Sequence, residues 1–406
     1  MKYKYKYLMI IIILQVFLLG IGKTSKFNDN YIYKNIYIED VNVSTLNIED
    51  AYNSIQRKYK EKNINLSYDN KTYKIKPKDI DLNFNIDKAV KEAYLYTRSE
   101  NSFDNIKRKI SLNTNNDYTI PLVATYNEQK LTNIISKICN DININEKDAT
   151  INVDETNKII RTESKNGKEV DKIKLKENIY DMIKNKKLED IDIPVNTITP
   201  KISTEDVNSI DTVLGQFSTT FNHTTARGNN IYVAAKDTSD ILIMPHKEFS
   251  YNKATGARTW HNGYKTAKVI VGGKYVNGEG GGVCQVSTTI YNACLLSGMD
   301  ITEVHNHTFI SRYAPAGRDA AVSYGYTDFK FKNPLKHPIY IKNVVNKGII
   351  TSKIYGCNDD REKIYITTKS NYEKEKIKVD TYRIYLDEEG NKIREELINK
   401  NIYKKK

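Results

Sequence analysis

Cysteine is scarce in this sequence, with four residues in a chain of 406. The four are Cys139, Cys284, Cys294 and Cys357, and no two of them form a Cys-x-x-Cys pair. This spacing argues against a zinc knuckle and against a dense disulfide framework, because both need closely spaced cysteines. One long-range disulfide stays open, since the sequence alone does not pair the thiols.

Histidine and tryptophan are also rare, and their positions divide the chain. All six histidines, the single tryptophan and most of the 19 glycines fall between residues 210 and 345. The stretch from about residue 30 to 205 has no histidine, and Gly167 is its only glycine. Histidine is the side chain that titrates near neutral pH, and glycine permits sharp turns at functional loops. We therefore expect any chemistry in the second region.

No nucleic-acid-binding module is recognisable, although the formal net charge is +13. The lysines are spread along the whole chain, which is also the pattern of a solvated basic surface. A positive net charge suits an anionic partner such as a wall polymer or a phospholipid surface. From the charge we expect an anionic wall polymer or a phospholipid surface as the partner, and no nucleic acid.

The one long apolar run lies at the N-terminus. Three lysines precede an uncharged apolar stretch from residue 7 to 22, a pattern typical of a secretion signal. The run is short for a bilayer span, which takes about 17–25 residues. No small-x-small cleavage site and no cysteine for lipid attachment follow it. We expect residues 1–28 to be a signal and membrane anchor, with the rest of the chain extracytoplasmic, either anchored or secreted.

Residues 35–118 and 119–200 form a weak internal repeat. Each combines helices, whose apolar residues recur at spacings of three and four, with short strands of alternating pattern. Proline and small polar residues then mark a linker over 201–211. We expect two small α+β modules, followed by an α+β domain over 212–345 and a β-rich extension over 346–406.

The most informative segment is Gly-Gly-Gly-Val-Cys-Gln-Val-Ser-Thr-Thr, residues 280–289. Glycine inside a regular element costs about 0.5–1 kcal/mol relative to alanine, but it permits sharp bends and close approaches. Cys284 is expected at the start of a helix, where peptide dipoles favour the nucleophilic thiolate. We interpret Cys284 as a candidate nucleophile, with a buried structural cysteine as the alternative. Cys294 and Cys139 fall on apolar helix faces and are expected in the core.

Neighbouring polar residues are candidates for binding substrate or stabilising an oxyanion. Ser287 and Thr288 fall in the expected first helical turn, where hydroxyls cap backbone amides. Those same amides are candidate oxyanion donors, and Gln285 is another. Arg258, in the preceding glycine-rich stretch, is the fourth candidate of this set.

His305 and His307 are candidate bases. An expected strand over 301–310 would place both on one face, because side chains two residues apart in a strand point the same way. His307 is our candidate base, and Asp319 or Asp328 the carboxylate that orients it. Two alternatives stay open: a non-catalytic histidine pair, and a metal site formed by Cys284, His305 and His307. We favour no metal and no cofactor.

The order of cysteine helix, histidine strand and then Asp-Ala-Ala-Val resembles the core of transglutaminase-like and papain-like cysteine enzymes. A longer resemblance is to the VanW family, the vancomycin B-type resistance accessory proteins. Its residues are Arg227, Glu248-Phe-Ser-Tyr-Asn252, Gly256-x-Arg-Thr259, the segment 280–293, His307, Tyr313-x-Pro-x-Gly-x-Asp-Ala320 and Asp328-Phe-x-Phe-x-Asn333. His246 departs from the pattern, since the family usually has glycine after the preceding proline.

Residues 35–200 resemble the peptidoglycan-binding repeats that precede VanW domains. The resemblances imply a wall-binding envelope protein, and they leave two functions open. In one, Cys284 attacks an amide of a wall peptide, with His307 as base and Asp319 as orienting carboxylate. In the other, the protein is a non-enzymatic accessory whose Cys284 motif is structural or lines a ligand pocket. Membership of a family does not by itself decide between them.

Overall fold

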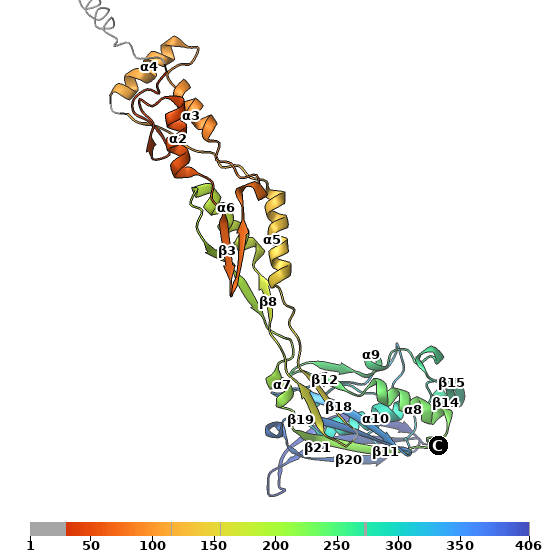
Figure 1. The fold of residues 1–406 in the computed structure, drawn as a ribbon. Helices are drawn as coiled ribbons and strands as arrows, with labels where there is room; N and C mark the ends of the chain where they lie inside the picture. The colour runs from red at the N-terminus through yellow and green to blue at the C-terminus, as the bar shows by residue number, and fades with distance from the viewer. Residues whose placement is uncertain (1–29, 115, 155, 272–273, 406) are drawn as a thin grey trace, which may run out of the picture. The chain divides into compact units, whose positions relative to one another are not determined.

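A computed structural model describes residues 30–114, 116–154, 156–271 and 274–405 (Figure 1). The expected signal and anchor over residues 1–28 lies outside the described residues. Within the described ranges, none of the helices combines the length and the apolar character that crossing a bilayer requires. The chain divides into two compact units, and the first comprises residues up to Asn145 together with Lys168–Ile198. The second comprises Glu146–Gly167 and the chain from Thr199 onward.

Unit 1 contains short strands covered by helices around one hydrophobic core. One three-stranded sheet has the order β2-β1-β5, with β1 and β5 parallel. A second has the order β4-β3-β9, and β10 pairs with β8. The bounds are β1 Ile36–Ile38, β2 Val41–Asn42, α2 Ile48–Tyr59, β3 Ile64–Tyr68, β4 Lys71–Ile75, α3 Ile86–Leu95, α4 Ser102–Asn113, β5 Tyr118–Ile120, α5 Glu128–Ile142, β8 Gly167–Val170, α6 Lys172–Asn185, β9 Ile191–Asp192 and β10 Val195–Ile198.

The two expected repeats are interleaved in unit 1. Strands β3 and β4 belong to the first expected repeat, yet β3 pairs in parallel with β9 from the second. Buried side chains from both stretches, such as Ile55 and Ile179, belong to one hydrophobic cluster. The hairpin of β6 (Thr150–Val153) and β7 (Ile159–Thr162) falls in unit 2. The expected domain boundaries stay a prediction, while the mixed α+β class is confirmed.

Unit 2 surrounds one central helix, α10, with strands and smaller helices. Its largest sheet is antiparallel with the order β11-β19-β18-β12, and β13-β17-β16 and β20-β21-β22 form two further sheets. The bounds are α7 Thr204–Asn208, β11 Thr212–Thr220, α8 Ala226–Asp237, β12 Ile241–Ile243, β13 Glu248–Ser250, α9 Tyr251–Thr255, β14 Thr266–Val271, β15 Lys274–Glu279, α10 Val283–Leu296, β16 Asp300–Glu303, β17 Lys330–Lys332, β18 Ile339–Asn346, β19 Ile349–Gly356, β20 Lys363–Tyr372, β21 Lys376–Leu386 and β22 Lys392–Lys404.

Helix α10 is buried on every side, which explains its sequence. Its polar side chains bond to other groups within the fold: Gln285, Ser287, Thr288, Thr289 and Asn292. The remaining positions are mostly apolar, and a helix buried on nearly all sides belongs in the centre of a domain. At its N-terminus Gly282 has φ of 116°, a left-handed value that favours glycine. The expected β-rich character of the C-terminal extension is confirmed by β19 to β22.

One element differs from its sequence-based expectation. The strand expected over 301–310 ends at Glu303, and the histidines follow in irregular backbone. The backbone amide of His307 donates to the Asp319 carboxylate, where a strand would bond to a neighbouring strand. Elsewhere in unit 2, helix α8 ends at Asp237, and residues 241–243 form strand β12, which pairs with β18.

Asn230 supports the glycine loop before Cys284 and provides a stability test. Its buried amide donates to the carbonyls of Lys265 (2.8 Å) and Gly281 (3.0 Å) and accepts from the Lys265 amide (2.7 Å). Asn230→Asp would aim a carboxylate oxygen at two carbonyls. We expect a loss of about 3 kcal/mol in the free energy of unfolding, measured by urea denaturation. Asn229→Asp, whose side chain makes one exposed bond to Gly263, is the matched control and should cost about 1 kcal/mol. Equal losses in the two variants would contradict this role of Asn230.

Candidate active site

Three glycines bring Cys284 to the second residue of α10. A Cβ on Gly280 would lie 2.7 Å from the Cβ of Arg258, and one on Gly281 would lie 2.6 Å from the Lys268 carbonyl oxygen. These close approaches allow the loop to pack tightly against its neighbours. Cys284 is half-buried, and its sulfur lies 3.5 Å from both the amide nitrogen and the carbonyl oxygen of Val322.

His307 and Asp319 lie beside this thiol. The Asp319 carboxylate accepts from the Nδ1 of His307 at 2.6 Å and from the His307 backbone amide at 2.8 Å. Because Nδ1 is held by the carboxylate, Nε2 is the ring nitrogen left for another partner. His307 and Cys284 line the same cleft, and each shifts the pKa of the other. The structure thus brings together the three residues that the sequence proposed as nucleophile, base and orienting carboxylate.

The electrostatics of the site favour a thiolate and an imidazolium. Burial disfavours ionisation of Cys284, but the hydrogen bond and charge of His307 outweigh it and lower the pKa of the thiol. The Val322 amide and the charge of Arg258 act in the same direction. Burial also disfavours the charged form of His307, yet Asp319 and Cys284 raise its pKa to about 10. A thiolate with this pairing is nucleophilic at neutral pH.

Tyr403 contacts the second carboxylate oxygen of Asp319. Its hydroxyl donates to Oδ1 at 2.5 Å and accepts from the Gly317 amide at 2.9 Å. The side chain is fully buried, and Asn401 on the same strand donates to the Gly317 carbonyl. Sequence reasoning missed Tyr403, because it lies 84 residues after Asp319 and only strand register brings the two together.

Gln285, Ser287 and Thr288 are buried and bonded elsewhere. The Gln285 amide nitrogen donates to the Thr219 hydroxyl and to the carbonyl of residue 220, and its oxygen accepts from Arg227. The Ser287 hydroxyl donates to the Ala320 carbonyl at 2.6 Å, and Thr288 accepts from the Ala320 amide at 3.0 Å. The side chains of Ser287 and Thr288 therefore anchor the segment that carries Asp319. None of the three side chains faces the thiol as a free donor.

Arg258 lies in the wall of the cleft and is 9% exposed. One guanidinium nitrogen donates to Asn252 at 2.6 Å, and the group stacks near the rings of Tyr251 and Tyr324. Its Nε and Nη1 have no hydrogen-bond partner among the described residues. The position of Arg258 is therefore consistent with its candidate role at the site. Its positive charge helps to lower the pKa of the Cys284 thiol.

The thiol opens into a cleft of about 680 Å³. Its wall contains Cys284, His307 and Tyr313, whose hydroxyl lies 3.5 Å from the Nε2 of His307. Basic side chains outnumber acidic ones in this wall: Arg227, Arg258, Lys268 and Arg312 against Glu279. An electropositive cleft of this kind concentrates anionic ligands.

The other sequence candidates lie outside the thiol site. His305 bonds to Glu303 at 3.0 Å, and its side chain is largely exposed. Asp328 accepts from Ser250 and from the Asn252 amide, so it holds the start of α9. Across the described part of the chain, no group of three histidine, cysteine or acidic residues is arranged to hold a metal ion. The alternative metal site thus lacks its third ligand.

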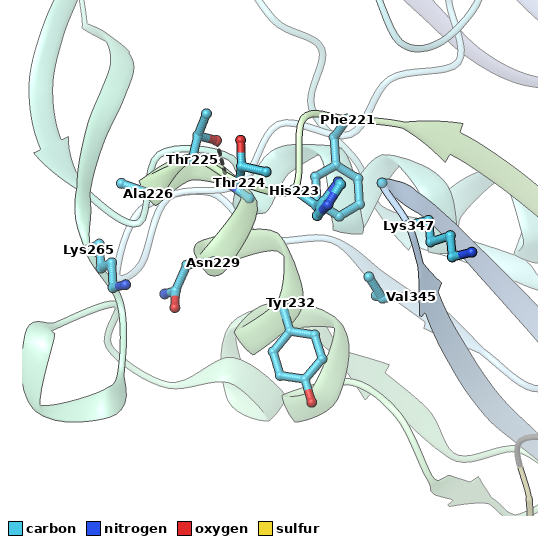
Figure 2. A pocket seen from close by; sticks show the side chains of 12 residues that line it. Phe221, His223, Thr224, Thr225, Ala226, Asn229, Tyr232, Lys265, Val345 and Lys347 are labelled. Atoms are coloured by element: carbon cyan, nitrogen blue, oxygen red, sulfur yellow. Dashed lines mark hydrogen bonds between the residues drawn. The ribbon is translucent and has the colours of Figure 1, made fainter.

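A separate pocket of about 520 Å³ lies at the start of α8 (Figure 2). Figure 2 shows Asn229 and Tyr232 on this helix, with Lys265 and Lys347 on the surrounding segments. Thr225 already caps the helix by accepting from the Gly228 amide at 3.0 Å. Both lysines are exposed, and this pocket does not include the thiol.

Comparison with known proteins agrees with this architecture. Residues 226–355 match the family model described as "VanW like protein", and residues 73–192 match "Putative peptidoglycan binding domain". The chain is 39% identical over 170 residues to "Uncharacterized protein YoaR" of Bacillus subtilis (strain 168), covering 41% of this chain and 56% of that protein. It is 28% identical over 109 residues to "Vancomycin B-type resistance protein VanW" of Enterococcus faecalis (strain ATCC 700802 / V583), covering 26% and 40%.

The matches place a segment similar to a peptidoglycan-binding domain ahead of a segment similar to the VanW-like family, which lies in the second unit. The chain spans about half the length of the curated relatives it matches. No solved structure matches it significantly.

The lowered pKa of Cys284 predicts selective alkylation. Iodoacetamide should label Cys284 at pH 7 far faster than Cys294, because burial raises the pKa of the Cys294 thiol well above its usual value. His307→Ala removes the charge that stabilises the Cys284 thiolate, so the pKa of this thiol should rise. Labelling of Cys284 should then require a pH above the usual pKa of a cysteine thiol. His305→Ala is the matched control and should leave the pH profile unchanged. Mass spectrometry of the labelled peptides measures both rates, and a His307→Ala profile like that of the parent would contradict the pairing.

Tyr403→Phe tests whether this hydroxyl positions Asp319. Losing one hydrogen bond to a charged group, worth about 1.5 kcal/mol, should slow alkylation of Cys284 at pH 7 roughly tenfold. With its orienting carboxylate less firmly held, His307 stabilises the Cys284 thiolate less well, so the acid limb of the profile should move to higher pH. Tyr365→Phe, on the same sheet and exposed, should change neither rate nor profile. A slower rate with an unshifted acid limb would indicate general destabilisation instead.

Proposed function

We propose that this protein is an extracytoplasmic, membrane-attached envelope protein that carries out cysteine-dependent acyl transfer or amide hydrolysis on a wall peptide. The observation that carries the proposal is the grouping of Cys284, at the start of a buried helix, with His307, whose ring is hydrogen-bonded to Asp319. A nucleophile, a base and a group that orients the base are the minimum set for such chemistry. The peptidoglycan-binding domain supports a wall polymer as the substrate.

In the proposed first step, the Cys284 thiolate adds to the carbonyl carbon of an amide. A carbon–sulfur bond forms, the carbon–nitrogen bond breaks, and the proton on the Nε2 of His307 passes to the leaving amine. Asp319 keeps the imidazole in the orientation that aims Nε2 at the reacting atoms. The product of this step is a thioester on Cys284 and a free amine.

In the second step, an amine or a water molecule attacks the thioester carbon. His307 takes a proton from the attacking group, a new carbon–nitrogen or carbon–oxygen bond forms, and the carbon–sulfur bond breaks to return the thiolate. An amine gives a transferred acyl group, and water gives a carboxylic acid. Which one reacts depends on whether the cleft admits an amine in preference to water.

A backbone amide is the proposed oxyanion donor. The Val283 amide donates to the Gly280 carbonyl at 3.2 Å, and the Gln285 amide donates to the Gly282 carbonyl at 3.0 Å. The side chain of Gln285 is also fully engaged. We therefore assign the oxyanion role to the amide of Cys284 itself, which lies in the same helical turn as the thiol and benefits from the helix dipole.

Attachment to the membrane is proposed from the sequence of residues 1–28. A basic start and an apolar run from residue 7 to 22 support a secretion signal that is retained as an anchor. Such an anchor would hold the peptidoglycan-binding domain and the thiol site on the outer side of the membrane, where their substrate lies.

Turnover of wall peptides separates the catalytic proposal from a non-enzymatic accessory role. Full-length protein incubated with soluble peptidoglycan fragments should produce transferred or hydrolysed stem peptides, and a thioester on Cys284 should be detectable by mass spectrometry. Cys284→Ala should abolish the products, and His307→Ala should lower the rate by at least about a hundredfold. His305→Ala, two residues away and bonded to Glu303, should retain the parent rate.

Binding of the fragments without turnover would contradict catalysis. If the parent binds peptidoglycan fragments but forms neither product nor thioester, the cleft is a ligand pocket and the accessory role holds. Co-sedimentation with insoluble peptidoglycan measures binding independently of the Cys284 chemistry, so the two roles give different results.

A further inference from the structure

Helix α4 in unit 1 presents its apolar side chains to solvent. Phe103 is 78% exposed, Ile106 57% and Ile110 58%. The three are spaced by three and four residues, so they form one stripe along the helix. Single exposed apolar side chains are common on soluble proteins, but three on one face of a twelve-residue helix form a continuous patch. Such a patch indicates a surface that contacts another molecule or a membrane.

The stripe faces directly away from the protein core. Leu112 is the buried residue of α4, with 2% exposure, and it follows Phe103 by nine residues. Nine residues are about two and a half helical turns, which places Leu112 and Phe103 on opposite sides. Helix α4 therefore has two apolar faces, and only the Leu112 face is covered by unit 1.

The described chain begins alongside α4. The carbonyl of Tyr31 accepts from Arg98, just before the helix, at 2.7 Å. The Asn35 side chain donates to the Leu112 carbonyl at 2.9 Å. Only seven residues separate the end of the apolar run at residue 22 from residue 30, and the eight peptide steps between them span at most roughly 28 Å. An anchor formed by residues 7–22 would thus keep α4 close to the lipid surface.

The charges around the stripe complement phospholipid headgroups. Helix α4 contains Lys107, Arg108 and Lys109 against one acidic residue, Asp104. Lys107 and Lys109 are exposed, and Lys107 directly follows Ile106 on the helix surface. Apolar side chains flanked by lysines are the pattern of helices that lie in the membrane interface.

We propose that α4 lies on the membrane surface, with Phe103, Ile106 and Ile110 inserted at the boundary between headgroups and acyl chains. Its lysines contact anionic headgroups. The inference rests on the membrane attachment in the proposed function and adds a second contact to it. This contact fixes which side of unit 1 faces the bilayer, which the anchor alone would not do.

Fluorescence quenching in vesicles tests the inference. Full-length Phe103→Trp protein is reconstituted into phosphatidylcholine–phosphatidylglycerol vesicles whose acyl chains carry bromine, a contact quencher. The signal of the native Trp260, measured in the parent protein, is subtracted. We expect at least half of the emission from position 103 to be quenched. Tyr372→Trp, a 69% exposed aromatic position in unit 2, is the matched control and should lose little emission.

Each outcome decides the question. Strong quenching at position 103 that falls when Ile106→Gln and Ile110→Gln are added supports insertion of the stripe. Protein that floats with the vesicles but shows equal quenching at positions 103 and 372 overturns the inference and leaves the anchor intact. Emission at 103 that is shifted to the blue but unquenched by brominated lipid indicates contact between protein copies and also overturns it. Protein that does not float with vesicles contradicts the membrane attachment itself, and the inference falls with it.

Discussion

The carboxylate of Asp319 is the group on which the thiol site depends. It is 1% exposed, and its two oxygens are divided between His307 on one side and Tyr403 on the other. The bond to the backbone amide of His307 also fixes the main chain that carries the imidazole. One buried carboxylate therefore sets the tautomer, the ring orientation and the backbone path of the base. Ser287 and Thr288 hold the segment on which this carboxylate is carried.

How much the sequence predicts depends on the range of the contacts. The turn at glycines 280–282 and the helix after it were predictable, because both depend on residues that are adjacent in the sequence. The role of Tyr403 was not, since it arises from strand register 84 residues away. Ser287 and Thr288 were expected in the first helical turn, where hydroxyls cap backbone amides. Their hydroxyls instead bond to the Ala320 segment, because α10 is buried on nearly all sides and its polar side chains face other parts of the fold.

The match to the VanW-like family ends at residue 355, before the sheet that supplies Tyr403. In this chain the site is therefore completed by β22, in the C-terminal extension. Arg383 on β21 is also buried, and it donates to the carbonyl of Met299, three residues after the end of α10. The C-terminal extension therefore supports the thiol site. One of the hydrogen bonds to Asp319 comes from this extension, outside the segment that matches the family.

The chain passes between the two units three times, near residues 145, 167 and 198. Residues 146–167 belong to unit 2, and the stretches of unit 1 before and after them are joined by the parallel pairing of β3 with β9. A single cut at any one crossing thus leaves two fragments that still share a folded core. Force that pulls the two units apart would be shared among the three connections, where a single linker would carry all of it.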